Sequence, residues 1–355
     1  MLKFFKGKTV LVTGHTGFKG AWLCTILIHS GAKVIGFSLE PPTEPSLFSL
    51  TNMAEKMISI IGDVRDYESL FRVFEQYRPE IVFHLAAQPL VRESYDDPKY
   101  TYETNVLGTV NVCECVRNCN SVKSFLNITT DKVYQNNEWE WGYREDDKLD
   151  GYDPYSNSKS CSELVTHSYK RSFFDENGIA VSTARAGNVI GGGDFAADRI
   201  IPDCMRAALS GNVLQIRNIN SVRPYQHVLE PLYAYLLIAK RQYEDIQAAG
   251  YYNVGPDEID SITTGELVNK FCDCWNRKLQ GEQEMRFEVQ GSASGPHEAN
   301  YLKLDCSRIH NRLGWHPRWT VSDAVEKTVE WILCYKNGKD IYECMVRQIE
   351  EYFQL

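Results

Sequence analysis

Residues 8–20 read KTVLVTGHTGFKG, and this stretch decides the fold. The β-branched run Lys8–Thr13 predicts a buried strand, and apolar residues at helical spacing from Phe18 to Ser30 predict a helix after it. Glycines between the two recur at every third position, which lets backbone N–H groups approach a pyrophosphate at the helix N-terminus. We therefore predict a dinucleotide site here; the alternative is that the glycines serve strand–helix packing alone. The residues that we assign to it are Gly14, Thr16, Gly17, Phe18, Lys19 and Gly20.

Strands and helices alternate along most of the chain. Further strands are expected at Lys33–Ser38, Met57–Ile61, Glu80–His84, Ser124–Ile128, Ile179–Arg185 and Tyr251–Val254, and helices at Tyr67–Tyr77, Tyr100–Cys119, Tyr155–Glu176, His227–Ala239, Ser261–Trp275 and Val321–Tyr335. This order predicts an α/β fold, a doubly wound, Rossmann-like parallel sheet with a smaller C-terminal α/β substrate lobe. We assign residues 1–187 to the dinucleotide-binding domain, with 225–256 returning to it, and residues 188–224 and 257–355 to the lobe.

The composition excludes several classes of function. Lys and Arg number 38 against 47 Asp and Glu, and no basic stripe predicts a nucleic-acid partner. No apolar run approaches the ~20 residues of a membrane span. The 11 cysteines include no C-x-x-C spacing, so we expect reduced thiols and no metal site. These features favour a cytoplasmic protein that acts on a small molecule.

Tyr155 and Lys159 are the strongest sign of chemistry. They lie four residues apart, on one face of a helix that Asp153 can cap and Pro154 can begin. A nearby ammonium group favours the phenolate form, so we expect Lys159 to lower the pKa of Tyr155. The alternative is that Tyr155 and Lys159 lie four residues apart on a helix face by chance.

Thr130-Asp131-Lys132 follows the expected fifth strand and adds two proton carriers. For Asp131 and Lys132 the alternative is a solvated turn or a surface ion pair. Together with Tyr155 and Lys159, this set suits the transfer of protons and a hydride on an alcohol.

The form of the cofactor depends on the end of the second strand. An acidic residue usually binds the ribose diol there, but Ser38 and Leu39 occupy the position, and Glu40 is a late substitute. No Arg follows to bind a 2′-phosphate, although Lys19 could partly serve. We therefore favour NAD over NADP. Asp63 and Val64 suit adenine, with an ordinary helix N-cap as the alternative for Asp63, and the small run Leu85, Ala86 and Ala87 lets the cofactor lie against the backbone.

With these motifs in place, the chain resembles the extended short-chain dehydrogenase/reductase family over almost its whole length. The motifs that carry the resemblance are Gly14-x-x-Gly17-x-x-Gly20, Asp63, His84-Leu85-Ala86-Ala87, Asn105, Thr130, Tyr155-x-x-x-Lys159 and Arg185-x-x-Asn188-Val189. The acid–base pair after Thr130 is similar to that of the sugar-nucleotide 4,6-dehydratases, whose thymidine-sugar members have Thr-Asp-Glu. Lys132 here, with the glycine loop and residues 223–232, resembles the branch that acts on CDP-glucose. The residues alone do not identify the nucleobase of the sugar nucleotide.

The resemblance implies a mechanism. Tyr155 removes the O4 proton while a hydride leaves C4, Lys159 lowers the Tyr155 pKa, and Thr130 hydrogen-bonds O4. Asp131 then protonates the leaving O6 hydroxyl and Lys132, as a neutral amine, removes the C5 proton, before the hydride returns to C6. The product is CDP-4-keto-6-deoxyglucose, a precursor of 3,6-dideoxyhexoses in O-antigen lipopolysaccharide. Asn105 joins the cofactor site by the same resemblance.

A sugar nucleotide also needs cations for its diphosphate. The candidate substrate residues are Arg92, Asn188, Arg199, Arg217, Arg223, His297 and Tyr301. A surface-solvated role is the alternative for each Arg. We interpret Arg185 as an orienting group, and His227 and the tryptophans as core. The resemblance further implies a homo-oligomer, a dimer or dimer of dimers, through the helices at 100–119 and 155–176. Two other readings stay open, a 4-epimerase or other sugar-nucleotide dehydratase and a non-catalytic dinucleotide sensor.

Overall fold

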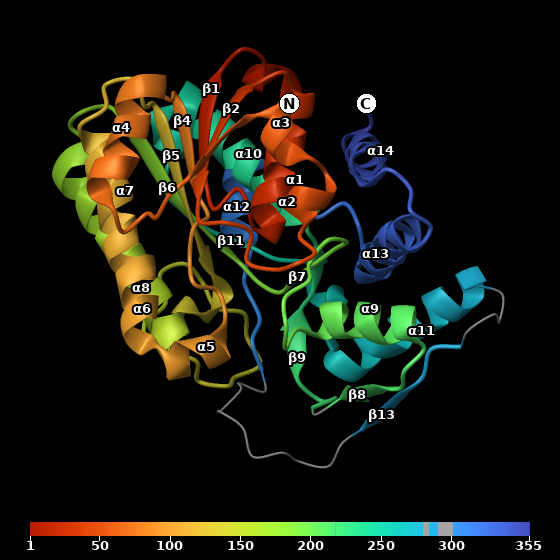
Figure 1. Ribbon diagram of the computed structural model, residues 1–355. Coiled ribbons are helices and arrows are strands. Elements are labelled where there is room, and N and C mark those ends of the chain that lie inside the picture. Colours follow the sequence, from red (N-terminus) through yellow and green to blue (C-terminus); the bar gives the residue numbers. More distant parts are fainter. Residues whose placement is uncertain (217, 280–283, 290–300) are drawn as a thin grey trace.

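A computed structural model describes residues 1–216, 218–279, 284–289 and 301–355. Its centre is a seven-stranded parallel sheet in the order β11-β6-β5-β4-β1-β2-β3 (Figure 1). The strands are β1 Thr9–Thr13, β2 Lys33–Ser38, β3 Ile58–Ile61, β4 Ile81–His84, β5 Ser124–Thr130, β6 Ala180–Ala186 and β11 Tyr251–Val254. The doubly wound α/β fold is confirmed, and every expected strand is present within two residues at each end.

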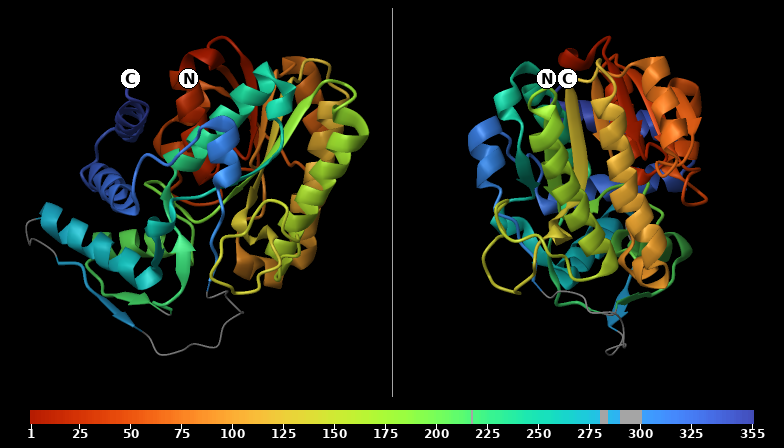
Figure 2. Two further views of the ribbon diagram at one scale, coloured as in Figure 1. Left: turned by 180° about the vertical axis from the view of Figure 1, so that it is seen from behind. Right: turned by 90° about the vertical axis from the view of Figure 1, so that its left-hand side faces the viewer.

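Helices cover both faces of the sheet. On one face are α4 Tyr67–Tyr77, α6 Pro98–Tyr102, α7 Gly108–Arg117 and α8 Pro154–Tyr169, with the short α5 Val91–Asp96 beside them; the other face carries α1 Phe18–His29, α10 Leu229–Glu244 and α12 Ser307–Leu313. The long helices α7 and α8 lie side by side in the right-hand view of Figure 2. Because helices lie on both sides, the strands other than β3 are buried along nearly their whole length without alternation.

One expected helix differs in detail. The segment predicted as a regular helix over Tyr100–Cys119 contains a π-helical turn, Glu103–Leu107, between α6 and α7. A second π-turn, Lys170–Phe174, ends α8. Single π-turns inside α-helices are frequent at functional sites. The first one carries Asn105, which is described with the site below.

The substrate-side elements lie beyond the carboxyl edge of the sheet, at the lower right of Figure 1. They are β7 Val189–Ile190, α9 Ile200–Ser210, β8 Leu214–Ile216, β9 Val222–Pro224, β10 Gln226–His227, β12 Ser261–Thr263, α11 Thr264–Leu279 and β13 Phe287–Val289. Small two-stranded pairs join them, β10 with β7, β12 with β9 and β13 with β8. The helix predicted from Ser261 begins three residues later, because residues 261–263 form β12 instead.

The remaining elements are α2 Leu47–Leu50, α3 Met53–Lys56, α13 Val321–Lys336, α14 Ile341–Phe353, and 3₁₀ turns at residues 2–5, 131–133, 246–248 and 258–260. The helix α14 packs against α1, and α13 packs against α14 and α11. In the described residues no helix is both long and apolar enough to cross a lipid bilayer.

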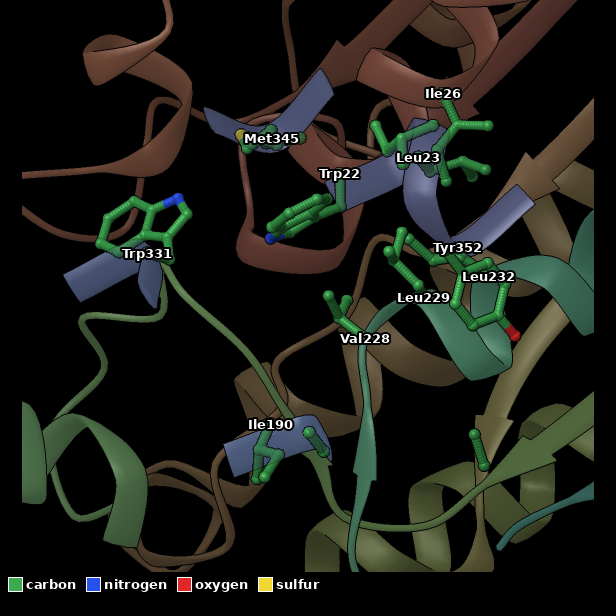
Figure 3. Close-up of a cluster of buried hydrophobic side chains, with 14 of the residues drawn as sticks. Trp22, Leu23, Ile26, Ile190, Val228, Leu229, Leu232, Trp331, Met345 and Tyr352 are labelled. Atoms are coloured by element: carbon green, nitrogen blue, oxygen red, sulfur yellow. The ribbon is translucent and has the colours of Figure 1, made fainter. Parts of the chain in front are cut away.

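The largest core cluster lies where α1, α10, α13 and α14 meet (Figure 3). Trp22 and Trp331 are fully buried there, with Val228, Leu229 and Tyr352. His227 is also fully buried, with its ring 6.0 Å from that of Trp22 and 4.9 Å from that of Trp319. Burial lowers its pKa to about 3, so it is neutral. The interpretation as core is confirmed for His227, Trp315 and Trp331, and Trp319 packs partly buried against the same cluster. It is wrong for Trp139 and Trp141, which are 37% and 67% exposed.

Candidate active site

The glycine-rich turn follows β1 directly, at the switch point between β1 and β4 where ligands bind to open parallel sheets. Two of its glycines are required by the fold. Gly14 has φ +74°, and a Cβ there would lie 2.7 Å from the Ala86 nitrogen; a Cβ on Gly20 would lie 2.1 Å from the Gly14 oxygen. Gly17 differs, because its Cβ would meet only the Gly14 oxygen, at 3.5 Å. Gly17 is also the N-cap of α1, where N–H groups need an acceptor. This open, uncapped helix end fits a pyrophosphate.

The end of β2 favours a cofactor without a 2′-phosphate. Thr16 Oγ1 hydrogen-bonds Ser38 Oγ and donates to the Leu39 carbonyl, each at 2.9 Å. A hollow of about 480 Å³ beyond the strand is lined by residues 40–44, 48 and 49, including the carboxylates of Glu40 and Glu44. Carboxylates attract a ribose diol and repel a phosphate.

Lys19 does not face this end of β2. Its Nζ lies 5.9 Å from the ring centroid of Tyr235, a fully buried residue of α10. Burial and the positive charge of Arg199 lower the pKa of Lys19 to about 8, and the charge of Lys19 acts in turn on Asp131 and Lys159. The suggestion that Lys19 serves a 2′-phosphate is therefore wrong, because its ammonium group lies near Tyr235 and its charge acts on Asp131 and Lys159.

Asp63 and Val64 follow β3. Burial disfavours the Asp63 carboxylate, but hydrogen bonds from Arg65, at 2.9, 2.9 and 2.6 Å, outweigh it and lower its pKa. The N-cap alternative for Asp63 is wrong, because Asp66 caps α4. The Val64 carbonyl accepts a hydrogen bond from Asn111 Nδ2 at 2.9 Å. The two residues lie at the carboxyl edge expected for the adenine.

Leu85–Ala87 continues from β4 beside the glycine turn. The Ala86 nitrogen donates to Thr13 Oγ1 at 3.2 Å, which ties this loop to the end of β1. Asn105, in the π-turn, accepts from the Gln88 nitrogen at 2.9 Å and donates to the Gln88 carbonyl and to Ser158 Oγ. Because its amide has these three protein partners, Asn105 holds the loop in place, a positioning role rather than a free cofactor contact.

Tyr155 enters the site from the first turn of α8. Asp153 caps this helix by accepting from the Ser156 nitrogen at 2.9 Å, and Pro154 begins it, as predicted. Burial raises the pKa of Tyr155 to about 12, against the opposing effects of a hydrogen bond with Thr130 and the charge of Arg199.

Lys159 lies one turn further along the same face. Burial and the charge of Lys19 lower its pKa to about 7, and its Nζ donates to the Ile128 carbonyl at 3.2 Å. The expectation that Lys159 lowers the pKa of Tyr155 is wrong for the chain without ligands, because burial makes Lys159 itself only partly charged at neutral pH.

Thr130, the last residue of β5, begins the acid–base segment. Its hydroxyl donates to Asp131 Oδ1 at 2.9 Å and accepts from the Lys132 nitrogen at 3.4 Å. Asp131 is 1% exposed, and burial raises its pKa against the opposing charge of Lys132 and the bond from Thr130. The surface ion-pair alternative is therefore wrong for Asp131. Its Oδ2 is buried and has no hydrogen-bond partner among the described residues.

The expected substrate residues approach this group from the lobe side. Arg223 of β9 is 6% exposed, and its charge acts on Asp131. Arg199, directly before α9, pairs with Asp194 at 3.0 Å, and its charge reaches Tyr155. Both cations therefore lie close enough for their charges to act on Asp131 and Tyr155.

Three further candidates lie further out or act through the backbone. Arg92 of α5 forms a half-exposed ion pair with Asp198 at 3.2 Å. The Asn188 carbonyl accepts from the Gln226 nitrogen at 3.0 Å, and Tyr301 forms a β-bridge with Val222 beside Arg223. Arg217 and His297 lie outside the described residues.

Sequence reasoning missed Glu163, a fully buried residue of α8 one turn beyond Lys159. Glu163 Oε2 pairs with Arg185 Nη2 at 2.9 Å in a fully buried ion pair, and Arg185 also donates to the Tyr134 hydroxyl and the Glu145 carbonyl. The interpretation of Arg185 as an orienting group is confirmed. Glu163 continues the series Tyr155, Lys159 at four-residue spacing, and that spacing is the signal that could have found it.

Comparison with known proteins agrees with this geometry. The family model described as GDP-mannose 4,6 dehydratase matches residues 11–328. The chain belongs to this dehydratase family. CDP-glucose 4,6-dehydratase of Salmonella typhimurium is 46% identical over 359 residues, which cover 98% of this chain and 97% of that protein. dTDP-glucose 4,6-dehydratase of Shigella flexneri is 28% identical and covers 92% of this chain and 93% of that protein.

Solved structures share the fold of this dehydratase family member at lower identity. dTDP-glucose 4,6-dehydratase of Bacillus anthracis, in complex with NAD, matches with a TM-score of 0.75 at 19% identity, over 95% of this chain and 100% of that one. UDP-glucose 4-epimerase of Thermus thermophilus, also with NAD, matches with a TM-score of 0.77 at 23% identity, over 92% and 99%. The resemblance to extended short-chain dehydrogenases/reductases is therefore confirmed.

Proposed function

We propose that this chain dehydrates CDP-D-glucose to CDP-4-keto-6-deoxy-D-glucose and uses NAD as a bound cofactor. The observation that carries the proposal is the buried Asp131 carboxyl, with one oxygen free, beside Thr130 and Tyr155. An epimerase has no use for an acid there. The 46% identity to CDP-glucose 4,6-dehydratase supports cytosine as the nucleobase of the substrate. The product would be a precursor of 3,6-dideoxyhexoses for O-antigen lipopolysaccharide.

NAD would supply a hydride acceptor that later returns the hydride, so no net oxidation results. The glycine turn with Thr16, Phe18 and Lys19 would hold its pyrophosphate side, Asp63 and Val64 the adenine, and Leu85–Ala87 the chain between them. The uncapped N-terminus of α1 and the open space at Gly17 support this placement. Glu40 and Glu44 beyond β2 support the unphosphorylated form. Lys159 would bind the nicotinamide ribose.

Tyr155 removes the O4 proton as the C4 hydrogen departs with its electron pair. The pKa of about 12 in the chain without ligands means that the phenolate needs support at this moment. The Thr130 hydrogen bond and the Arg199 charge both provide it. The hydroxyl of Thr130 donates to Asp131 and accepts from the Lys132 nitrogen, which leaves one acceptor position for the O4 hydroxyl.

The new C4 ketone acidifies the C5 hydrogen. Lys132 removes this proton and Asp131 protonates the O6 hydroxyl, which leaves as water; the hydride then returns to C6. Burial keeps the carboxyl of Asp131 able to hold a proton nearer to neutral pH. Arg199 and Arg223 hold the diphosphate, with Arg92, Asn188, Arg217, His297 and Tyr301 as outer contacts to the nucleotide and the sugar.

Product mass tests the proposal. Purified protein would be incubated with NAD and each of CDP-, dTDP-, UDP- and GDP-glucose. We expect loss of one water from CDP-glucose only. A product of unchanged mass would indicate epimerisation, no product would indicate a binding module, and dehydration of another nucleotide-glucose alone would refute the choice of cytidine.

We also propose that the chain works as a cytoplasmic homo-oligomer, a dimer or dimer of dimers. Leu107 in the first π-turn and Leu164 on α8 are 55% and 52% exposed, and Phe173 beyond α8 is 38% exposed. Apolar side chains gathered along paired helices are typical of a subunit interface. The eleven cysteines are all free, which fits a reducing compartment. Leu164→Glu should convert the oligomer to monomer in light scattering; an unchanged mass would refute this interface.

A further inference from the structure

Two catalytic segments that are separate in the sequence meet at the end of β5. The acid–base pair, Asp131 and Lys132, lies in the 3₁₀ turn directly after this strand, and Tyr155 lies on α8. Pairing within the sheet stops before the pair, because β5 is in register with β4 only as far as Asn127 and with β6 as far as Thr130. The hydrogen bonds of a sheet lie in its plane, whereas α8 packs on its face. Side-chain contacts must therefore set how far the acid–base pair lies from Tyr155.

One such contact lies immediately before the acid–base turn. The Thr129 hydroxyl donates to Glu163 Oε1 of α8, and both side chains are buried. Glu163 is itself held by other donors, since its Oε2 accepts from Thr183 Oγ1 at 2.8 Å and from Arg185 Nη2 at 2.9 Å. The carboxylate is thus fixed from β6, and Thr129 ties the end of β5 to it. We call the contact between Thr129 and Glu163 the strand anchor.

A second contact lies at the far end of the turn. The hydroxyl of Ser160, on α8, donates to the Val133 carbonyl at 2.7 Å and accepts from the Gly151 nitrogen at 3.0 Å. Gly151 is packed directly against α8, where a Cβ would lie 2.3 Å from the backbone of Ser156. Ser160 therefore joins α8 both to the end of the acid–base turn and to the segment just before the helix cap. We call the contact between Ser160 and Val133 the turn anchor.

We propose that Glu163 and Ser160 are positioning residues that hold the acid–base pair at its working distance from Tyr155. The inference rests on the proposed function and adds to it. The strand anchor and the turn anchor enclose residues 130–132 from both ends, and both lead to the helix that carries Tyr155. Each positioning residue acts through the backbone of this segment, and its hydrogen bonds are made with protein.

The anchors should affect the two steps of the reaction unequally. Oxidation uses NAD and Tyr155, which the helix cap places in the first turn of α8. Thr130 is still in register with Ala186 of β6. Loss of water uses Lys132 and Asp131, which lie beyond the last paired residue and between the anchors. A displacement of about 1 Å can cost on the order of a hundredfold in rate, so a weakened anchor should slow the loss of water far more than oxidation.

The ratio of the two steps tests the inference. Each variant would be mixed with NAD and CDP-glucose, with reduced cofactor followed by absorbance and product by mass. Thr129→Val and Ser160→Ala should accumulate reduced cofactor, because the 4-keto intermediate forms faster than it loses water, and kcat should fall at least about tenfold with little change in KM. With CDP-6-deoxyglucose, which has no O6 leaving group, both should reduce the cofactor near the wild-type rate. Thr129→Ser keeps the hydroxyl and should restore the wild-type behaviour.

Thr183→Val is the matched control. Thr183 also donates to Glu163, but from β6, which does not lead into the acid–base turn. We expect this variant to lose stability in urea denaturation without accumulating reduced cofactor. Accumulation in Thr183→Val as large as in Thr129→Val would overturn the inference, as would a wild-type ratio of the two steps in both Thr129→Val and Ser160→Ala.

Ser160→Ala decides the question if Thr129→Val does not fold. Alanine favours the helix, and the Val133 carbonyl keeps the Asp150 nitrogen as a donor at 3.0 Å, so this variant should fold. A wild-type protein that forms neither reduced cofactor nor a dehydrated product would refute the proposed function instead. Normal dehydration by the wild type, with anchor variants that match the control, removes only the positioning role of Glu163 and Ser160.

Discussion

The glycine turn allows a sharp prediction, because its three glycines are required for different reasons. Gly17→Ala adds a methyl group that meets only the Gly14 oxygen, at 3.5 Å, an ordinary contact. Its backbone, at φ −77° and ψ 169°, suits any residue. Alanine is a poorer N-cap than glycine but loses less chain entropy on folding, so the free energy of unfolding should change by less than about 1 kcal/mol.

Affinity for NAD should respond very differently. The methyl group would fill the space in which the pyrophosphate approaches the N–H groups of α1. We expect the dissociation constant of NAD to rise at least about tenfold, which corresponds to roughly 1.4 kcal/mol. Calorimetric titration with NAD and urea denaturation would measure the two effects on the same protein.

Gly20→Ala is the matched control. Its added Cβ would lie 2.1 Å from the Gly14 oxygen, a backbone atom that cannot move without distorting the turn. Overpacking of this kind costs about 1–3 kcal/mol or more, so here the loss should appear in stability first. Wild-type NAD affinity in Gly17→Ala would refute the placement of the pyrophosphate. Equal destabilisation by both variants would refute the argument that a Cβ has room at Gly17 but not at Gly20.

Further variants test other parts of the site. Tyr155→Phe should form no reduced cofactor with CDP-glucose, and normal reduction would remove Tyr155 from its role. Lys132→Ala should still reduce the cofactor but exchange little solvent deuterium into C5; exchange at the wild-type rate would exclude Lys132 as the base. Arg185→Met leaves the Glu163 carboxylate buried without its fully buried partner, so urea denaturation should show a loss of about 3–5 kcal/mol, and a loss below about 1 kcal/mol would contradict a structural ion pair. Burial raises the pKa of Glu230 to about 7 despite its hydrogen bonds. Its contribution to stability should therefore be lost as the pH rises from the unfolded-state pKa toward about 7, at up to roughly 1.4 kcal/mol per unit, and Glu230→Gln should abolish that slope in denaturation curves at several pH values.

The sequence was sufficient for the sheet because the decisive signals are local. A β-branched run, a glycine at every third position and a helix start lie within 13 residues, and the continuous apolar strands require cover on both faces. The cap by Asp153 and the start at Pro154 placed Tyr155 correctly, since capping depends on adjacent residues only. The π-turn around Asn105 was not predicted, and the partner of Asn105 in it, Gln88, is 17 residues away, where no local pattern points to it.

The ionisation of the site shows where sequence reasoning stops. Adjacent residues suggested that Lys159 assists Tyr155, but the structure surrounds both with protein and brings Lys19 from the glycine turn close enough to act on Lys159. Desolvation depends on every neighbouring atom, and the neighbours come from α1, α8, α10 and the loop before α9. No local pattern contains that information.

What the sequence by itself determined is the set of groups and their order along the chain: a phosphate turn, a hydroxyl–carboxyl–amine triplet and a phenol–amine pair on one helix face. The tertiary structure alone decided which of these groups share hydrogen bonds and which are removed from water. Parallel strands bring β5 and the start of α8 to one edge, so that Tyr155 is buried beside the Thr130–Asp131 hydrogen bond. Spacing along a helix or strand is fixed by covalent geometry, whereas proton affinity is fixed by burial and by charges that only folding brings together.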